Sequence, residues 1–587
     1  MSVAEPAVLS PAAPEGGGDG EAAERRWPWL VGLGVVLVVA FGLRIWGVKQ
    51  GLPYAYNADE NAHFVPNAIG LFRHGWNPHY FVNPPAYTYL LHVVFDLWFG
   101  GRAGVSNALA TNPTEVFVVA RVTAAVVGTI AVWLLYLAGA KLFGRAVGLL
   151  AAALLAVSFL PVFYSHLALN DVPTLAPIAL SLWGTAGVLR EGRLRDYLIA
   201  GVGLGLACAT KYTGGIVLLP LVAAGGIRLA VPDGRYAAAR GLVLAGIVAL
   251  AAFVVANPYA VLDLAAFRDG LQHQADAADD ALGKLGLTQS SGHLYYLWTF
   301  TWGLGWVPLI AGVVGVGLLA VDDRRALLVL APAPILYVLY MGIQARFFGR
   351  WLLPVFPIAC LLGAYAVVRL SQLASRRVPA LAPALAVLGT VLLLGQGIVY
   401  SLHSAMTLSR PDTRNKARAW LVDHVPANTK IVVEPVVPDA WATDIGRLNR
   451  GTANGARWSK FPTSRSNIAD DGSVIPGPGR IVNIEDYERT LYPGLIDKYV
   501  DKGYCWVVVG STQRGRAEAQ PKVVPRAIEY YRDLERRSTL AYEASPYHEG
   551  AGPVKFNFDW TFDFYPLAYA RPGPVMQVYR LKGGKCG

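Results

Sequence analysis

Long apolar stretches separated by short polar connections dominate the first 400 residues of the chain. A helix of about 20 apolar residues crosses the ~30 Å hydrocarbon core of a bilayer. The first stretch, Trp27–Trp46, has this length and no small-residue cleavage site after it, so it predicts a retained membrane helix. Ten more stretches lie at about 116–140, 145–163, 172–189, 197–210, 213–230, 241–257, 299–320, 326–343, 352–370 and 379–400. The pattern predicts a polytopic α-helical membrane protein with about eleven transmembrane helices.

Lysine and arginine gather in alternate connections between these stretches. They stand at Arg25 and Arg26; Lys141 and Arg145; Arg190, Arg193 and Arg195; Arg228, Arg235 and Arg240; Arg324 and Arg325; and Arg376 and Arg377. Because cytoplasmic loops collect cations, the alternation predicts a cytoplasmic N-terminus. An odd number of spans then leaves residues 401–587 outside. Residues 1–26 are rich in Ala, Pro, Gly and Glu, which predicts a disordered cytoplasmic segment.

The first outer connection, at about 49–115, is long and half apolar. Part of it is therefore expected to lie on the membrane surface as interfacial helices. Together with the spans it predicts one membrane domain over residues 27–400.

The last 187 residues have a different pattern, in which helix and strand signals alternate. These signals are a helical pattern at 417–424, an apolar run at 430–433, a β-rich run at 504–510, an amphipathic helix at 526–537 and a last strand at 575–581. Such alternation predicts a small α/β domain over residues 401–587, on the extracytoplasmic side. Cys505 and Cys586 fall in this domain and could pair if it is extracytoplasmic.

Composition agrees with a membrane protein and explains the charge. The chain is 54% hydrophobic and 16% charged, whereas a soluble chain carries about 25% charged residues. Its net charge of +11 follows from the cation-rich cytoplasmic loops, so it does not indicate a nucleic-acid partner. No glycine-rich phosphate loop follows the strands of the C-terminal part.

Two acidic positions stand at the outer ends of predicted spans. Asp59 and Glu60 follow the first span, in Tyr56–Phe64, and Asp171 begins the fourth. Asn57 and Glu60 have the spacing of a helix capping box, and Asp171 before Pro173 is typical of a helix start. The other interpretation is that a carboxylate acts as a general base at the membrane surface.

Five cations also lie near the outer ends of spans: Arg44, Arg121, Lys211, Arg346 and Arg350. Each alone could simply extend its charged end towards the headgroups. Together they concentrate positive charge where the orientation rule would thin it out. A lipid phosphate lies at that depth, and arginine binds phosphate through two parallel hydrogen bonds, so the group predicts a phosphate site.

His63, His166 and His273 could join the acids around a divalent metal ion, although their spacing is not that of a known ligand set. We therefore expect no certain cofactor and leave a divalent metal open.

The order of short motifs along residues 27–400 resembles the protein O-mannosyltransferase and aminoarabinose transferase branch of the GT-C glycosyltransferases. The motifs are ADENAHF at 58–64, Asn83-Pro84-Pro85-Ala86-Tyr87, Arg121, HLALNDVP at 166–173, TKYTGG at 210–215 and RWLLP at 350–354. The C-terminal domain matches that branch only loosely, as an appended extracytoplasmic module.

The resemblance implies a GT-C-like fold and an inverting glycosyltransferase, with or without a metal ion, whose donor is a polyprenyl-phosphate sugar. It assigns the catalytic acid to Asp59, with Glu60 beside it, and a second acid to Asp171. The phosphate-binding positions would be Lys211, Arg350, Arg346 and Arg121. The family often has His or Lys before the Pro-Pro pair, where this chain has Asn83, so the sugar and the acceptor stay open.

The expected partners are the lipid-linked sugar, membrane lipids and an acceptor that is a protein, a lipid or a wall glycan. The composition, rich in Ala, Gly, Val and Arg, favours a bacterial cytoplasmic membrane. Three alternatives remain open. They are a lipid or glycan transporter or flippase, an oligosaccharide ligase with a diphosphate-linked donor, and a non-catalytic receptor that acts through its C-terminal domain.

Overall fold

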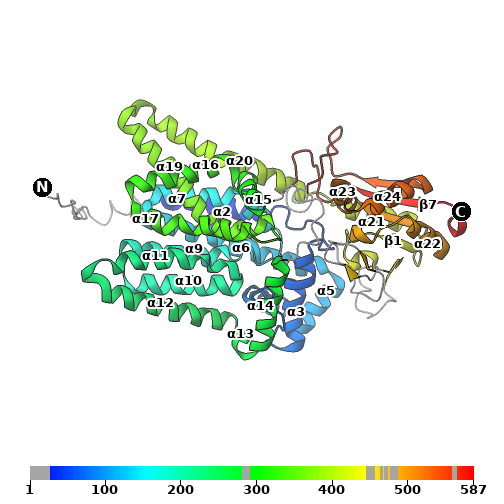
Figure 1. The fold of residues 1–587 in the computed structure, drawn as a ribbon, viewed down its shortest axis with the longest axis horizontal. Coiled ribbons are helices and arrows are strands. Elements are labelled where there is room, and N and C mark those ends of the chain that lie inside the picture. Colours follow the sequence, from blue (N-terminus) through cyan, green and yellow to red (C-terminus); the bar gives the residue numbers. More distant parts are fainter. Residues whose placement is uncertain are drawn as a thin grey trace.

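A helical body and a smaller sheet-containing domain lie at opposite ends of an elongated molecule (Figure 1). The computed structural model describes residues 27–279, 291–444, 456–462, 467–468, 474–475, 487–557 and 565–587. The predicted disordered segment at residues 1–26 lies outside these ranges.

Helices form almost all of the body. The described helices are α2 (Trp27–Ile45), α6 (Pro113–Phe143), α7 (Arg145–Val157), α8 (Phe159–Tyr164), α9 (Leu175–Arg190), α10 (Leu194–Thr210), α11 (Leu218–Leu229), α12 (Arg235–Ala256), α13 (Tyr259–Leu262), α14 (Leu264–Asp279), α15 (Gly292–Phe300), α16 (Trp306–Asp322), α17 (Arg324–Leu330), α18 (Pro332–Gly342), α19 (Phe356–Arg377) and α20 (Ala382–Leu408). In the part of the chain that the structure describes, eight helical segments are long and apolar enough to cross a membrane, and α7 and α9 are shorter apolar helices. The polytopic helical class is confirmed, while the count of eleven spans stays a prediction.

Small residues bring the central helices close together. A Cβ added at Gly139 of α6 would lie 2.8 Å from the Cα of Gly148 in α7. Transmembrane helices often associate through such small residues, because lipid tails leave no hydrophobic drive between helices. Helices α7 and α9 are buried along most of their length, whereas α12 and α16 present apolar side chains outward. This places the lipid-facing surface on the outer helices.

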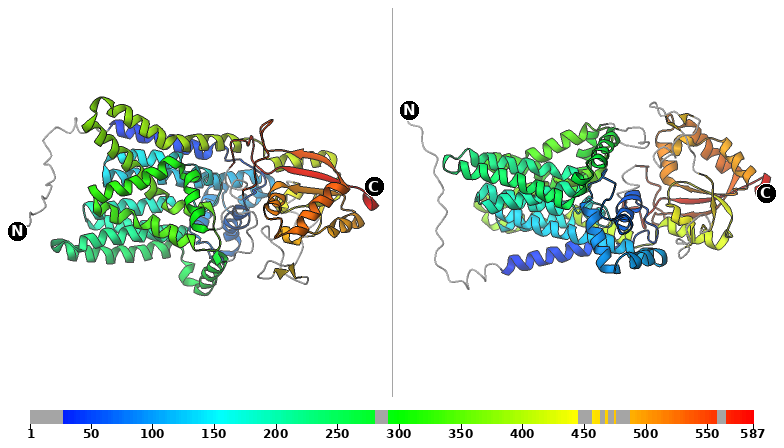
Figure 2. Two further views of the ribbon diagram at one scale, coloured as in Figure 1. Left: turned by 45° about the horizontal axis from the view of Figure 1, so that its top comes forward. Right: turned by 90° about the horizontal axis from the view of Figure 1, so that it is seen from below.

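Three helices occupy the first outer connection: α3 (Val65–His74), α4 (Ala86–Phe99) and α5 (Arg102–Thr111). They lie between the helical body and the C-terminal domain in the views of Figures 1 and 2. At the same end of the body, α20 ends at Leu408, and the first helix of the C-terminal domain, α21 (Thr413–His424), follows at once.

The C-terminal domain has a five-stranded mixed sheet in the order β2-β1-β5-β7-β6. Its strands are β1 (Lys430–Val433), β2 (Ser459–Lys460), β5 (Trp506–Gly510), β6 (Ser538–Ala544) and β7 (Met576–Leu581), and β3 (Asn467–Ile468) pairs with β4 (Val474–Ile475) apart from it. Strand β1 is parallel to β2 and β5, and β7 is antiparallel to β5 and β6. The predicted α/β domain is confirmed as a small sheet domain.

Helices cover both faces of this sheet. A further helix, α23 (Ser511–Ala519), follows β5. Val507 and Val509 face α22 (Gly494–Lys502) and α24 (Pro525–Arg537), whereas Val508 between them belongs to the core formed with α21. This follows from the alternation of side chains along a strand. Cys505, just before β5, forms a disulfide with Cys586, with 5.2 Å between the Cα atoms. The antiparallel pairing of β5 with β7 brings these two cysteines together.

A buried carboxyl group lies where β1 ends. Glu434 is 1% exposed. Its Oε2 accepts a hydrogen bond from the Gly510 backbone N–H at 3.0 Å, and its Oε1 accepts one from the Tyr531 hydroxyl at 2.8 Å. Burial raises the pKa of the Glu434 carboxyl from 4.5 to about 8. This group therefore makes the stability of the domain depend on pH.

We expect the C-terminal domain to lose stability as the pH rises from about 4.5 to about 8. In this window the unfolded chain releases the Glu434 proton while the folded domain keeps it, so the slope from this one group is up to ~1.4 kcal/mol per pH unit. Hydrogen-exchange protection of the β5 amides in the whole protein measures it. Glu434→Gln should flatten the slope, whereas Asp501→Asn, at an exposed position, should leave it unchanged. An unchanged slope in Glu434→Gln would contradict the assignment.

Candidate active site

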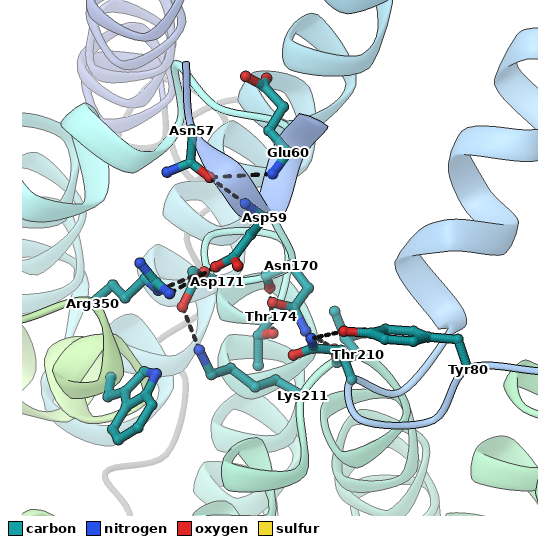
Figure 3. A network of polar contacts seen from close by, with 12 residues as sticks. Asn57, Asp59, Glu60, Tyr80, Asn170, Asp171, Thr174, Thr210, Lys211 and Arg350 are labelled. Carbon is teal, nitrogen blue, oxygen red and sulfur yellow. Dashed lines mark hydrogen bonds and ion pairs between the residues drawn. The ribbon is translucent and has the colours of Figure 1, made fainter. Parts of the chain in front are cut away.

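Two acids and two cations lie together in one network of polar contacts (Figure 3). Arg350 Nη2 lies 2.7 Å from Asp59 Oδ2, and Arg350 Nε lies 3.8 Å from Asp171 Oδ2. Lys211 Nζ forms an ion pair with Asp171 Oδ1. The chain thus brings together four of the residues that the sequence singled out. They come from four separate segments.

The Asp59 side chain is carried by the first helical turn after the outer connection begins. Asn57 Oδ1 accepts hydrogen bonds from the backbone N–H groups of Asp59 and Glu60, each at 3.1 Å. This satisfies two donors that a helix start leaves free. The turn continues as a π-helical segment, η1 (Glu60–Phe64), before α3. The side chain of Asp59 is 35% exposed, so it can reach a ligand.

Asp171 and Lys211 are held by a turn next to α9 and α10. The Asn170 side-chain amide donates to the Thr210 carbonyl at 2.8 Å, and the Thr174 hydroxyl donates to the Asn170 carbonyl at 2.6 Å. These bonds tie the segment before α9 to the last residue of α10, directly before Lys211. Asp171 is 3% exposed. The pair therefore forms the inner, drier half of the site.

Arg350 is the second residue of the short helix η5 (Gly349–Val355), which leads into α19. Its guanidinium carbon lies 4.6 Å from the centre of the Phe348 ring, and that of Arg346 lies 5.4 Å from the same ring. Cations over an aromatic face are attracted by its electron density. Arg346 is thus next to the cluster, and Arg350 is the cation that bridges the two acids.

Glu60 and Arg121 form a separate ion pair that is fully buried. Arg121 Nε and Nη2 donate to the two Glu60 carboxylate oxygens at 2.7 Å, and both side chains have no exposed surface. The Ala168 backbone N–H also donates to Glu60 Oε1 at 2.9 Å. Figure 3 shows the Glu60 side chain directed away from Arg350 and Lys211. The Glu60 half of the expected capping box is therefore used elsewhere, and the pair is placed to hold the loop.

The weak metal candidates are spread apart. Nδ1 of His166 lies 2.9 Å from the Val162 carbonyl and its Nε2 lies 3.0 Å from the Trp46 carbonyl, while the His63 ring stacks on Tyr80. Among the described residues, no three His, Cys, Asp or Glu side chains are grouped to hold a metal ion. His273, on α14, is exposed. Asp59 and Asp171 are each paired with a cation, so the residues present do not fit a divalent metal.

Two uncharged residues, Tyr80 and Asn83, form a hydrogen-bonded pair next to the charged cluster. The pattern of charges along the sequence did not predict this pair. Asn83 donates from its amide to the Tyr80 hydroxyl at 3.1 Å. Burial, with Asp59 nearby, raises the pKa of the Tyr80 hydroxyl to about 12. Figure 3 shows this hydroxyl directed towards Asn170 and Thr210. Tyr80 stays protonated at neutral pH and can act as a hydrogen-bond donor; only the aromatic density of the outer connection could have suggested it.

The chemistry available to this arrangement is proton transfer and charge stabilisation. An exposed carboxylate can accept a proton from a hydroxyl, and two cations can stabilise negative charge on a leaving phosphate. The site combines both within one cluster. It therefore suits transfer of a group from a phosphate to a hydroxyl.

The fold is similar to that of a membrane-embedded oligosaccharyltransferase of known structure. The oligosaccharyltransferase of Archaeoglobus fulgidus, solved with a tethered acceptor peptide, matches with a TM-score of 0.51 at 14% sequence identity, over 92% of this chain and 75% of that chain. Residues 105–259 match the family model described as dolichyl-phosphate-mannose-protein mannosyltransferase. The structural match shows a similar fold, and the family-model match covers about a quarter of the chain.

The matched stretch includes Arg121, Asp171 and Lys211, whereas Asp59 and Arg350 lie outside it. ArnT of Cupriavidus metallidurans bound to undecaprenyl phosphate matches with a TM-score of 0.46 at 15% identity, over 69% of this chain and 82% of that chain. The mycobacterial arabinofuranosyltransferase AftD matches with 0.41 at 15% identity, over 95% and 42%. No curated protein sequence matches the chain.

Proposed function

We propose that the protein transfers a sugar from a polyprenyl-phosphate carrier to an acceptor hydroxyl, with inversion, on the outer face of a bacterial cytoplasmic membrane. The observation that carries the proposal is the cluster in which Asp59 and Asp171 face Arg350 and Lys211. The matched family model adds support, because its description names a dolichyl-phosphate-linked sugar as donor.

In the proposed reaction Asp59 is the general base. It takes the proton of the acceptor hydroxyl as that oxygen forms a bond to the anomeric carbon. The bond from the anomeric carbon to the phosphate oxygen breaks, and the polyprenyl phosphate leaves with the electron pair. Arg350 and Lys211 stabilise the charge that appears on the phosphate. A single in-line displacement inverts the anomeric centre, and no second carboxylate is needed as an acid.

The resting ion pairs give donor binding a second effect. A phosphate that bonds Arg350 Nη2 competes with Asp59 Oδ2 for that nitrogen and for the charge of the guanidinium. The carboxylate of Asp59 is then free to accept a hydroxyl proton. Donor binding thus weakens the contact between Arg350 and Asp59, the proposed base. The ion pair with Asp171 keeps Lys211 in place.

The outer location rests on two independent features. Cations concentrate in alternate connections, which favours a cytoplasmic N-terminus. The Cys505–Cys586 disulfide lies in the C-terminal domain, and disulfides persist in oxidising compartments. Both features support a location of the C-terminal domain and the cluster outside the cytoplasm.

The test is release of free polyprenyl phosphate from a labelled polyprenyl-phosphate sugar by the purified protein with an acceptor. Glycosyl transfer breaks the bond between sugar and phosphate, whereas a transporter or flippase leaves it intact. A ligase would instead consume a diphosphate-linked donor and release polyprenyl diphosphate. Absence of both products with every donor and acceptor class would contradict the proposal.

We expect Lys211→Ala and Arg350→Ala each to weaken binding of the donor lipid. Each removes a charged hydrogen-bond partner of the phosphate, which typically costs ~1.5–3 kcal/mol in a partly buried site. Arg350→Lys should recover only part of the loss, because the forked geometry of the guanidinium is gone. Donor affinity measured with the purified variants checks this, and Arg102→Ala, on the exposed side of α5, is the control. Normal binding by both alanine variants would place the phosphate elsewhere.

A further inference from the structure

The chain segment that leads from α2 to Asp59 is held by hydrogen bonds from the helical body. Arg121 Nη1 donates hydrogen bonds to the carbonyls of Val48 and Gln50, both at 2.8 Å. The same guanidinium holds Glu60, the residue after Asp59. One buried side chain on α6 therefore fixes the chain both before and after the proposed base.

The C-terminal domain donates hydrogen bonds to the next carbonyls of the same segment. The Asn415 side-chain amide, on α21, donates to the Gly51 carbonyl at 3.2 Å and to the Leu52 carbonyl at 3.1 Å. Its Oδ1 accepts a hydrogen bond from the Tyr56 hydroxyl. The amide thus uses both of its donors and its acceptor on a segment more than 350 residues away in the sequence.

Two aromatic side chains of the segment enter the C-terminal domain. Tyr54 is 6% exposed and belongs to the core formed by α21 and the sheet. The Arg414 guanidinium lies 3.6 Å from the centre of the Tyr56 ring, and that of Arg418 lies 5.2 Å from the centre of the Tyr54 ring. Arg414 is itself fixed by two hydrogen bonds to Asp412, at 2.9 and 2.7 Å. The C-terminal domain therefore holds this segment in two ways: Tyr54 packs in its core, and Arg414 contacts the Tyr56 ring.

From these contacts we infer that Asn415 and Tyr56 are positioning residues for Asp59, so that the C-terminal domain is part of the catalytic scaffold. The inference rests on the proposed role of Asp59 as base. Tyr56 is three residues before Asp59, next to the capping Asn57, so its position sets where the helical turn begins. Asp59 is one-third exposed and is not fixed by burial. A displacement of about 1 Å at a reacting group can cost a hundredfold in rate.

The test compares Asn415→Ala, Asn415→Asp and Tyr56→Phe with Lys416→Ala in the full-length protein. Lys416 is exposed on the same helix, which makes it a matched control. We expect Asn415→Ala to lower kcat about tenfold to a hundredfold, with donor KM, donor affinity and melting temperature close to wild type. Asn415→Asp should be as slow although it has the same shape, because it cannot donate to the Gly51 and Leu52 carbonyls. Tyr56→Phe keeps the ring under Arg414 and should be intermediate.

A merely structural junction would give a different result, namely a lower melting temperature with kcat unchanged per folded molecule. That result, or normal kcat in all three variants, would overturn the inference while wild-type activity and an inactive Asp59→Asn variant left the proposed function standing. If instead the wild-type protein released no polyprenyl phosphate, or Asp59→Asn were fully active, the proposed function itself would fail.

Discussion

Asp59→Asn should abolish glycosyl transfer while the protein stays folded and still binds the donor lipid. Asparagine has the size of aspartate and can still accept a hydrogen bond from Arg350, but it cannot take a proton from the attacking hydroxyl. General-base catalysis is typically worth ~10²–10⁴ in rate. Single-turnover transfer from a labelled polyprenyl-phosphate sugar measures the loss, and donor affinity and melting temperature show that only the chemical step has changed.

Glu60→Gln is the informative companion to this variant. Glu60 is buried against Arg121 and the Ala168 backbone, so its replacement should lower stability and slow the chemical step of the folded fraction less than Asp59→Asn does. The two neighbouring carboxylates are thereby separated into a reacting group and a supporting group. Transfer by Asp59→Asn within a few-fold of wild type would show that the acid pair is structural and that the proposed base is wrong.

Arg121→Met should destabilise the protein by ~3–5 kcal/mol, because it leaves the Glu60 carboxylate buried without its counter-ion. The Val48 and Gln50 carbonyls also lose their donor. Adding Glu60→Gln should recover part of the stability, since the double variant buries no charge, and the amide oxygen can still accept from Ala168. Unfolding in detergent measures both, with Arg102→Met at an exposed position as the control. If the double variant were no more stable than Arg121→Met, the buried charge would not be the cause.

The membrane fold could be predicted from the sequence because its signals are local. Each apolar stretch is long enough to identify itself, and β1, β5, β7 and α24 follow from runs of a few residues. Strand β6 was not predicted. It is an edge strand, exposed along most of Ser538–Ala544, so it has no alternation of apolar and polar positions. The disulfide could be raised only as an option, because the neighbourhood of Cys505 and Cys586 depends on the β5–β7 pairing.

The charged residues of the candidate site could be predicted from the sequence. Which acid pairs with which cation could not be predicted. Asp59, Asp171, Lys211 and Arg350 stand out because ionised groups are costly at the ends of membrane helices. The same criterion also selected Glu60 and Arg121, which form a buried pair of their own. Distances along the chain cannot separate the two groups, since every partner is remote in sequence. Their roles in catalysis stay predictions.

The contacts between Asn415 of the C-terminal domain and the segment before Asp59 could not be predicted from the sequence. Asn415 and Tyr56 are ordinary polar residues whose meeting depends on how two domains dock. Neither residue carries a charge or a spacing that would mark it.

In the resting site the positive charges of Arg350 and Lys211 are already balanced by Asp59 and Asp171. An open cationic pocket at the membrane surface would be occupied by anionic headgroups, which greatly outnumber any carrier lipid in the same leaflet. A balanced pocket attracts such headgroups weakly, because each must displace an existing ion pair before it gains one. Only a ligand with further contacts, such as a sugar held beside Tyr80 and Asn83, has binding energy to spare for that exchange. Under the proposed function, the internal pairing therefore disfavours common anionic lipids at this site.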